Sequence, residues 1–403
     1  MAILRAFTHR SFVLLWSGQT VSRLGDSFYT IALAWWVLQK TGSATAMGGV
    51  LICSTVPMLL CLLFGGVAVD RFSRVHLMLA SDLLRGAVVV LVALLALLQW
   101  LELWQIFVLS ALFGIVDAFF YPAARAITPD LVPTELLPAA NSLGDLSAQG
   151  ATFIGPAIAA LIIALGGTWL AFALDGLSFL ISSVCLVALP RVPALRQGAE
   201  KEAGVLRDMY QGIKAVLDSP WLWVTLVIAC VSTIFLVGPA EAVLPLLVKQ
   251  RFGEQVGVLA LLTSLSALGS VLAAFWLGQF KRLRRRGLLS YGAWLLSGLA
   301  LLVMGLPLPV AGVSAAFFIQ GVCFTVLGLA WVSSLQDSVP AHLLGRVTSI
   351  DYLVSSALTP VGYGVAGIVA DHIGAAPVFV IGGAIAVTVI ALGLLHPDIR
   401  AVD

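Results

Sequence analysis

Long apolar segments that carry almost no charge dominate the sequence. The longest charge-free run extends from Gly287 to Gln336. A helix needs about 20 apolar residues to cross the hydrocarbon core of a bilayer, so this run holds two crossings, which Pro307-Leu308-Pro309 separates. Charged residues make up only 10% of the chain and hydrophobic residues 60%, whereas a water-soluble domain carries roughly 25% charged residues. These proportions predict a membrane protein in contact with lipid and exclude a soluble enzyme. A net charge of only +2 gives no basic surface for a nucleic-acid partner.

Twelve segments have the length and composition of transmembrane helices. Their ranges are 12–38, 46–69, 77–99, 104–125, 141–165, 169–189, 221–248, 256–280, 288–306, 310–334, 349–370 and 374–395. An even number of crossings places both termini on one side of the membrane. Most Lys and Arg residues, including the cluster at 281–286, lie in loops on that same side, and only Lys40, Lys249 and Arg251 lie in loops on the other. The positive-inside rule therefore predicts a multi-pass protein of the inner (plasma) membrane with both termini in the cytoplasm.

The chain is predicted to have three parts. Residues 1–189 and 221–403 each hold six helices, and the polar segment 190–220 joins them. Within this linker, apolar residues from Val205 to Leu217 recur at helical spacing beside Arg207, Asp208 and Lys214. Such a pattern indicates an amphipathic helix that lies on the inner membrane surface, or else docks on a partner.

An internal repeat relates the two halves. Asp130-Leu-Val-Pro133, followed by two leucines and a serine, is matched half a chain later by Asp337-Ser-Val-Pro340 in the same context. Two six-helix bundles in the same order imply a pseudo-two-fold axis along the membrane normal, the arrangement of transporters whose halves rock about a central site.

Several short motifs resemble the major facilitator superfamily. The segment 66–74, Gly-Val-Ala-Val-Asp-Arg-Phe-Ser-Arg, is similar to the family's loop motif, with Ser73 in place of the usual glycine and Val75 in place of a second basic residue. Gly155-Pro156 resembles the core of the family's antiporter motif, with alanines at three glycine positions. Ser22-Arg-Leu-Gly-Asp26 and Gly345-Arg-Val resemble the drug:proton antiporter branch, which includes macrolide efflux pumps and the enterobactin exporter.

This resemblance implies an all-α fold of twelve transmembrane helices in two pseudo-symmetric six-helix bundles. It also implies secondary active export of amphipathic or hydrophobic small molecules by proton antiport and alternating access, in a monomer that uses the proton gradient and no cofactor. Asp70 is then expected to approach the start of the eleventh helix and, with nearby basic residues, to close the inner side. The expected gating residues are Asp70, Arg71, Arg74, Arg125, Gly155 and Pro156. For Arg71 and Arg74, simple retention of the loop in the cytoplasm is an alternative.

Carboxylates inside the apolar segments are the candidates for proton coupling. A charge at mid-bilayer costs about 2.5–3.5 kcal/mol on insertion scales, so such a group needs a cation or a proton. Asp26 and Asp117 lie within predicted helices, and Glu241 follows the helix-bending Pro239. Arg23 lies one turn before Asp26, so a local ion pair or a purely structural network is the alternative for Asp26. Asp175 is expected to be structural.

Aromatic residues of the fourth, seventh and tenth segments are the candidates for the substrate cavity, which the family places there. They are Phe119, Phe120, Phe235, Phe317, Phe324 and Trp331. Core packing or lipid contact is the alternative for each one. No His or Cys spacing suggests a metal site, and no nucleophile–base motif supports a membrane enzyme. Export of one endogenous compound, such as a siderophore or a lipid-like metabolite, remains a second interpretation.

Overall fold

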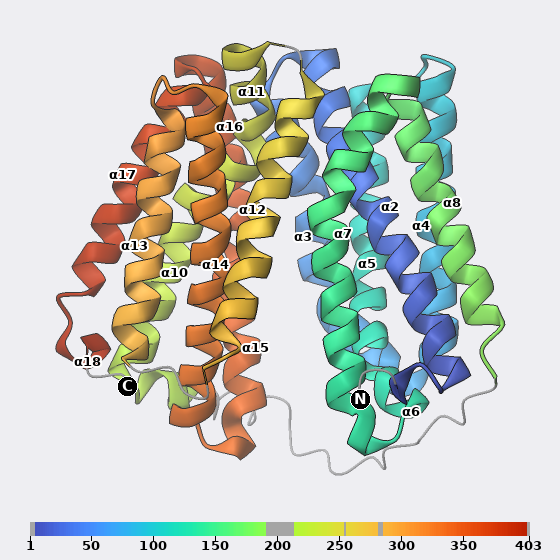
Figure 1. Ribbon diagram of the computed structural model, residues 1–403, viewed down its shortest axis with the longest axis horizontal. Coiled ribbons are helices and arrows are strands. Elements are labelled where there is room, and N and C mark those ends of the chain that lie inside the picture. The colour runs from blue at the N-terminus through green and yellow to red at the C-terminus, as the bar shows by residue number, and fades with distance from the viewer. Residues whose placement is uncertain (1–4, 191–212, 254, 281–284, 401–403) are drawn as a thin grey trace. The chain divides into compact units, whose positions relative to one another are not determined.

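The structure, a computed structural model, describes residues 5–190, 213–253, 255–280 and 285–400. These residues form helices joined by short connections (Figure 1). Eleven described helical stretches are long and apolar enough to cross a membrane. The helix Arg10–Thr41 (α2) is as long, but its middle carries Arg23 and Asp26. The all-helical membrane fold expected from the sequence is confirmed.

The chain divides into two compact units. The first comprises residues up to Arg196 except Ser43–Gly48, together with Gln255–Ser264, and the second comprises the rest. This division differs from the expected halves because the start of α3 (Ala44–Arg71) groups with the second unit and the start of α12 (Val256–Leu277) with the first. Much of the linker, residues 191–212, and with it most of the expected amphipathic helix, lies outside the described residues. Val216, near the end of the linker, is buried in a cluster with Leu222 and Leu335.

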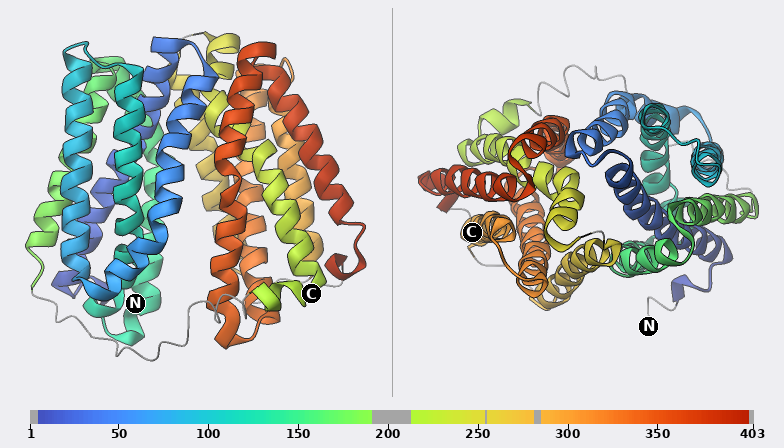
Figure 2. Two further views of the ribbon diagram at one scale, coloured as in Figure 1. Left: turned by 180° about the vertical axis from the view of Figure 1, so that it is seen from behind. Right: turned by 90° about the horizontal axis from the view of Figure 1, so that it is seen from above.

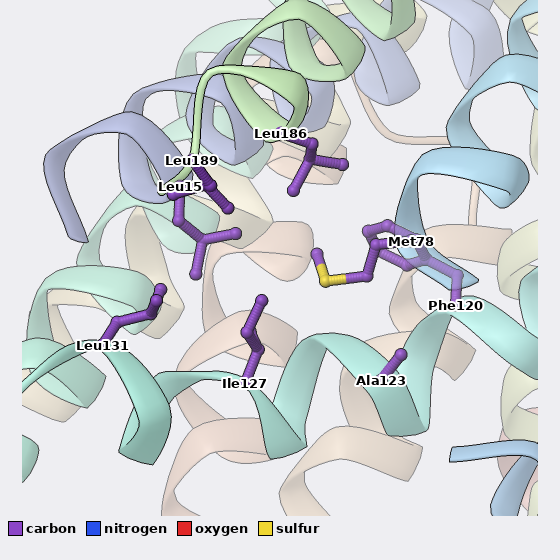
Figure 3. Close-up of a cluster of buried hydrophobic side chains, with 8 residues drawn as sticks. All are labelled: Leu15, Met78, Phe120, Ala123, Ile127, Leu131, Leu186 and Leu189. Carbon is purple, nitrogen blue, oxygen red and sulfur yellow. The ribbon is translucent and has the colours of Figure 1, made fainter. Parts of the chain in front are cut away.

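The first unit is a bundle of long helices. Besides α2 and most of α3 it contains α4 (Arg74–Leu97), α5 (Leu103–Ala126), the single turns α6 (Thr128–Leu131) and η1 (Thr134–Leu136), α7 (Leu137–Gly166) and α8 (Thr168–Val187). Helix α8 packs on α2 and α4, α7 packs on α2, and α5 packs on α4. A cluster of buried apolar side chains, from Leu15 on α2 to Leu131 on α6, fills the end of the bundle near the N-terminus (Figure 3).

The second unit repeats this packing. Its helices are α10 (Pro220–Gly238), the π-helical segment η2 (Pro239–Val243), α11 (Leu244–Phe252), most of α12, α13 (Arg286–Gly305), α14 (Val310–Ser338), α15 (Ala341–Ala357), α16 (Thr359–Ile373), α17 (Ala375–Gly393) and α18 (Pro397–Arg400). Helix α17 packs on α10 and α13, α16 packs on α10, and α14 packs on α13. These are the four pairings of the first unit in the same order along the chain, and Figure 2 shows each bundle from behind and from above.

Two predicted crossings are interrupted. Pro239 cannot donate a backbone hydrogen bond, and the seventh crossing passes through one π-helical turn at this point before it continues as α11. The eleventh crossing is divided into α15 and α16 at Leu358, two residues before Pro360. Both breaks follow from proline inside a long apolar segment.

The last turn of α16 caps the first residues of α3 within the second unit. Asp371 accepts hydrogen bonds from the Ala44 N–H (2.8 Å), the Thr45 N–H (3.1 Å) and the Ser43 hydroxyl (2.5 Å). A carboxylate at a helix N-terminus satisfies unpaired N–H groups and complements the helix dipole. This contact explains why residues 43–48 group with the second unit.

Candidate functional site

A polar cavity of about 550 Å³ lies inside the first unit. Helices α2, α4, α5 and α7 line it, and its apolar wall includes Leu15, Met78 and Phe120, which also belong to the cluster of Figure 3. Its charged lining residues are Arg23, Asp26, Arg85, Arg125 and Asp145. Burying charged groups among apolar helices opposes folding, so these residues mark a candidate functional site.

Arg85 on α4 is the centre of a buried charge cluster. Its Nη2 donates to Asp82 Oδ1 (2.5 Å) and its Nη1 donates to Asp117 Oδ1 (2.8 Å), while only 4% of its side chain is exposed. Asp82 lies three residues before Arg85, which puts both on one face of α4. Its second oxygen accepts a hydrogen bond from Ser182 of α8 (2.6 Å). One guanidinium therefore joins α4 to α5, and Asp82 extends the network to α8.

Aromatic rings enclose the Arg85 guanidinium. Its central carbon lies 3.9 Å from the centroid of Phe120, 4.7 Å from that of Phe179 and 5.9 Å from that of Phe113. The negative faces of aromatic rings attract a cation, most strongly where water is excluded. These contacts hold Arg85 in its charged form at a fixed position.

Asp26 lies on the wall of the cavity beside this cluster. Its carboxylate has no hydrogen-bond partner among the described residues, although Arg85, Asp117 and Asp82 lie close enough to act on it electrostatically. The possible ion pair with Arg23 is not formed. Arg23 instead donates to the Gly144 carbonyl (2.5 Å) and to the Ser147 hydroxyl (3.1 Å), since α7 packs against this face of α2.

Asp175 on α8 is completely buried in the same unit. Its Oδ1 accepts a hydrogen bond from Ser178 (3.2 Å), and its Oδ2 has no partner among the described residues. Gly25 gives this carboxyl its space, because a Cβ at that position would overlap Asp175 Oδ1 and Ser178 Oγ. Asp175 therefore lies against the backbone of the residue that precedes Asp26.

The expected gating residues lie in several different environments. Arg74, at the start of α4, bonds to the Ala126 carbonyl (2.7 Å) and to Asp130 (2.6 Å), so it ties two parts of its own unit together. Arg71 and Arg125 are exposed, and the side chain of Asp70 lies outside the described set. Gly155 permits close packing, because a Cβ there would overlap Ser27 of α2, and Pro156 is buried beside it.

The second unit contains an equivalent of the Arg74 contacts. Arg286, at the start of α13, bonds to the Ser333 carbonyl (3.0 Å) and to Asp337. Ser333 precedes Asp337 by four residues, as Ala126 precedes Asp130. The structural counterpart of Arg74 is therefore Arg286.

Glu241, the third expected proton-coupling residue, belongs to the second unit. It is in the π-helical segment η2, and its Oε2 accepts a hydrogen bond from the Tyr363 hydroxyl of α16 (2.5 Å). Asp26 and Asp117 are thus brought together by the fold of the first unit, whereas Glu241 has a neutral tyrosine as its hydrogen-bond partner.

A second cavity, of about 260 Å³, lies inside the second unit and is mainly apolar. Two of the expected aromatic residues, Phe324 and Trp331, line it together with Trp294. Asp351 provides its one acidic group and accepts a hydrogen bond from Trp331 Nε1 (3.0 Å). Phe120 lines the first cavity instead, and Phe317 is buried in the core. Phe119 and Phe235 are half-buried and line neither cavity.

Comparisons with known proteins agree with this architecture. The family model described as Major Facilitator Superfamily matches residues 15–363. Macrolide efflux protein A of Streptococcus pyogenes is 27% identical over 97% of both chains. The multidrug efflux pump Tap of Mycolicibacterium fortuitum is 30% identical over 94% of both chains. The enterobactin exporter EntS of Shigella boydii is 26% identical over 85% of this chain and 81% of its own.

Solved structures show the same fold at low sequence identity. A bacterial homologue of the iron transporter ferroportin, in an inward-facing state, superposes with a TM-score of 0.75 at 14% identity, over 96% of this chain and 99% of its own.

Proposed function

Because the chain belongs to the major facilitator superfamily, we propose that it exports amphipathic or hydrophobic small molecules in exchange for protons. Membership makes it a multi-pass secondary transporter and not an enzyme. The export direction, the substrate class and the proton coupling are the proposed part. We place it in the inner (plasma) membrane as a monomer, with both termini in the cytoplasm.

The buried carboxylates of the first unit carry the proposal of proton coupling. Arg85 is bonded to Asp82 and Asp117, and Arg23 is bonded to Gly144 and Ser147 of α7. Within the described part of the chain, neither guanidinium is hydrogen-bonded to Asp26. A carboxylate without a cation in a low-dielectric site gains stability when it binds a proton and loses it when water returns. Asp26 lines a cavity, so a change in access to that cavity changes the environment that governs its protonation.

The apolar cavity of the second unit supports the proposed substrate class. Small-molecule sites are mostly apolar, with a few polar groups that fix the orientation of the ligand. Phe324, Trp331 and Trp294 offer aromatic faces, and Asp351 offers a negative charge at the same cavity. This combination suits an aromatic or macrocyclic compound that carries a positive charge. Two of the similar proteins are named as a macrolide efflux protein and a multidrug efflux pump.

Coupling requires that a bound proton and a bound substrate favour different conformations of the protein. A ligand shifts a conformational equilibrium only by its difference in affinity for the two states. If protonation favours the inward-facing state and substrate favours the outward-facing state, protons that enter the cell drive substrate out. The alternating-access proposal rests on this difference.

A drug-susceptibility panel in an efflux-deficient bacterium tests the proposal. Cells that express the wild-type protein should tolerate higher concentrations of several lipophilic cations and macrolides, and a protonophore should abolish that tolerance. Asp26→Asn should remove the tolerance at equal expression. Unchanged susceptibility with the wild-type protein across the panel would contradict export of this class.

Export of one endogenous anionic compound is the second candidate, and the arginines in the lining of the first cavity are the observation behind it. Arg23, Arg85 and Arg125 all contribute to that cavity. Asp82 and Asp117 more than balance Arg85, so Arg23 and Arg125 are the cations that remain to attract an anion, against the carboxyl groups of Asp26 and Asp145 in the same lining. This candidate predicts that Arg125→Ala lowers transport of a catecholate siderophore and leaves drug tolerance unchanged.

A further inference from the structure

Asp175 is a buried acid to which the proposed proton exchange has so far assigned no role. It is fully buried on α8, and its Oδ2 has no partner among the described residues. An ionised carboxylate in that position would be an uncompensated buried charge, a far less favourable form than the neutral acid. A neutral acid carries one O–H proton, which it can release to a neighbouring base.

The surroundings of Asp175 identify that neighbouring base. Among the charged side chains, Asp26 exerts the largest electrostatic effect on Asp175. The Asp175 carboxyl occupies the space that Gly25 leaves open, directly beside Asp26 in the chain. Two carboxyl groups that share a low-dielectric site do not both ionise, so the pair retains one proton.

The other ionisable groups around the pair are fixed by their own partners or remain neutral. Tyr29 on α2 packs its ring against Phe113 and Phe172. Arg85 is hydrogen-bonded to both Asp82 and Asp117, from α4 and α5. Arg23 on α2 and Asp145 on α7 line the same cavity as Asp26, and Arg23 is bonded to Gly144 and Ser147. The part of α7 that follows Asp145 contains no titratable side chain up to Gly166. Asp26 and Asp175 are the two carboxyls of this network without a hydrogen-bonded cation among the described residues.

We propose that Asp175 and Asp26 form a two-carboxyl proton site, in which Asp175 holds a proton away from the cavity and passes it to Asp26 on the cavity wall. The O–H bond on Asp175 breaks as one forms on Asp26, so the charge of the cluster is unchanged by the transfer. Arg85 is a positioning residue, because its hydrogen bonds hold the carboxyl groups of Asp82 and Asp117 and keep them out of this exchange. This inference deepens the proposed proton antiport and rests on it.

Infrared difference spectroscopy tests proton exchange at Asp175 without any transported substrate. The full-length protein, reconstituted in lipid with carboxyl-¹³C-labelled aspartate, is compared in acid and alkaline buffer. The wild-type protein should lose a carboxylic-acid C=O band on alkalinisation. That band should be missing in Asp175→Asn and altered in Asp26→Asn, because the two groups share the proton. A difference spectrum of Asp175→Asn identical to that of the wild type would overturn the proposal.

Transport in proteoliposomes tests whether this site couples protons to substrate. With ethidium as the probe, Asp175→Asn should lower uptake driven by a pH gradient by about tenfold or more, the size of a moderate coupling between sites. Ethidium exchange at equal pH should remain at the wild-type rate, since the neutral amide resembles the neutral acid. Asp175→Glu, which restores a carboxyl group, should recover part of the driven uptake.

A matched control on the same helix separates a lost proton site from a disturbed core. Ser183 is also buried on α8 with an unpartnered hydroxyl among the described residues, and Ser183→Ala should leave both ethidium assays unchanged. Gradient-driven uptake by Asp175→Asn at the wild-type level would overturn the proposal. If a pH gradient does not drive ethidium uptake by the wild-type protein, the proposal of proton antiport is wrong. The infrared comparison then still decides whether Asp175 exchanges a proton.

Discussion

Removal of the Arg85 side chain should destabilise the first unit strongly, by a predictable amount. Arg85→Met replaces the guanidinium with an apolar chain that can still pack against Phe120 and Phe179. The substitution leaves Asp82 and Asp117 without their cation in a site where Arg85 is 4% exposed. Removal of one partner from a buried ion pair costs about 3–5 kcal/mol. For a unit of this size, about 2–4 °C of melting temperature per kcal/mol gives a loss of roughly 6–20 °C.

The same reasoning predicts that the melting temperature recovers when the two carboxylates left without a cation are also replaced. Replacement of a complete buried ion network by uncharged groups is often neutral. The triple variant Asp82→Asn, Arg85→Met, Asp117→Asn should therefore melt within a few degrees of the wild type, although it has lost more polar contacts. The assay is thermal unfolding of the purified protein in one detergent, followed by size-exclusion chromatography of heated samples. A triple variant that melts lower than Arg85→Met alone would refute the reasoning.

Three further predictions concern packing, the Arg74–Asp130 and Arg286–Asp337 ion pairs, and ligand charge. Asp130→Asn should lower the melting temperature more than Asp337→Asn, because the Asp130 side chain is 6% exposed and that of Asp337 is 65% exposed. Gly25→Ala should lower the free energy of unfolding by about 1–3 kcal/mol, because the added methyl group would overlap α8. Gly150→Ala should be neutral or stabilising in the same unfolding assay, because the space around its Cα is open. Asp351→Asn should weaken export of cationic dyes and spare neutral macrolides, measured as tolerance in the efflux-deficient strain; equal losses for both would rule out its charge as the reason.

The sequence alone predicts the helices well, because a crossing needs a long apolar segment and the segments are separated by charge, glycine or proline. It also identifies Asp26 and Asp117, since a carboxylate in such a segment is conspicuous. Their common partner Arg85 and its neighbour Asp82 are recognised only in the structure, although the sequence holds a signal for them: an Asp and an Arg three residues apart lie on one helix face.

The contacts between distant segments were beyond the reach of sequence pattern. The hydrogen bond between Ser182 and Asp82 depends on how α8 packs against α4, and nothing in either segment specifies the other. Sequence position alone favours a structural role for Asp175, whereas its proposed role in proton exchange rests on an Oδ2 without a partner among the described residues and on the space that Gly25 leaves for it. The burial of a polar group and its hydrogen-bond partners depend on how the helices pack, so they can be read only from the structure.

Proton flux measured together with substrate flux tests the central claim most directly. Proteoliposomes with the purified protein, suspended in a weakly buffered external medium, are given an outward-directed ethidium gradient, and external pH is followed with a fluorescent indicator. Proton antiport predicts that ethidium efflux drives protons inward, so the external medium becomes alkaline, and that Asp26→Asn abolishes this change. Ethidium efflux from wild-type proteoliposomes without any change of external pH would contradict proton-coupled export.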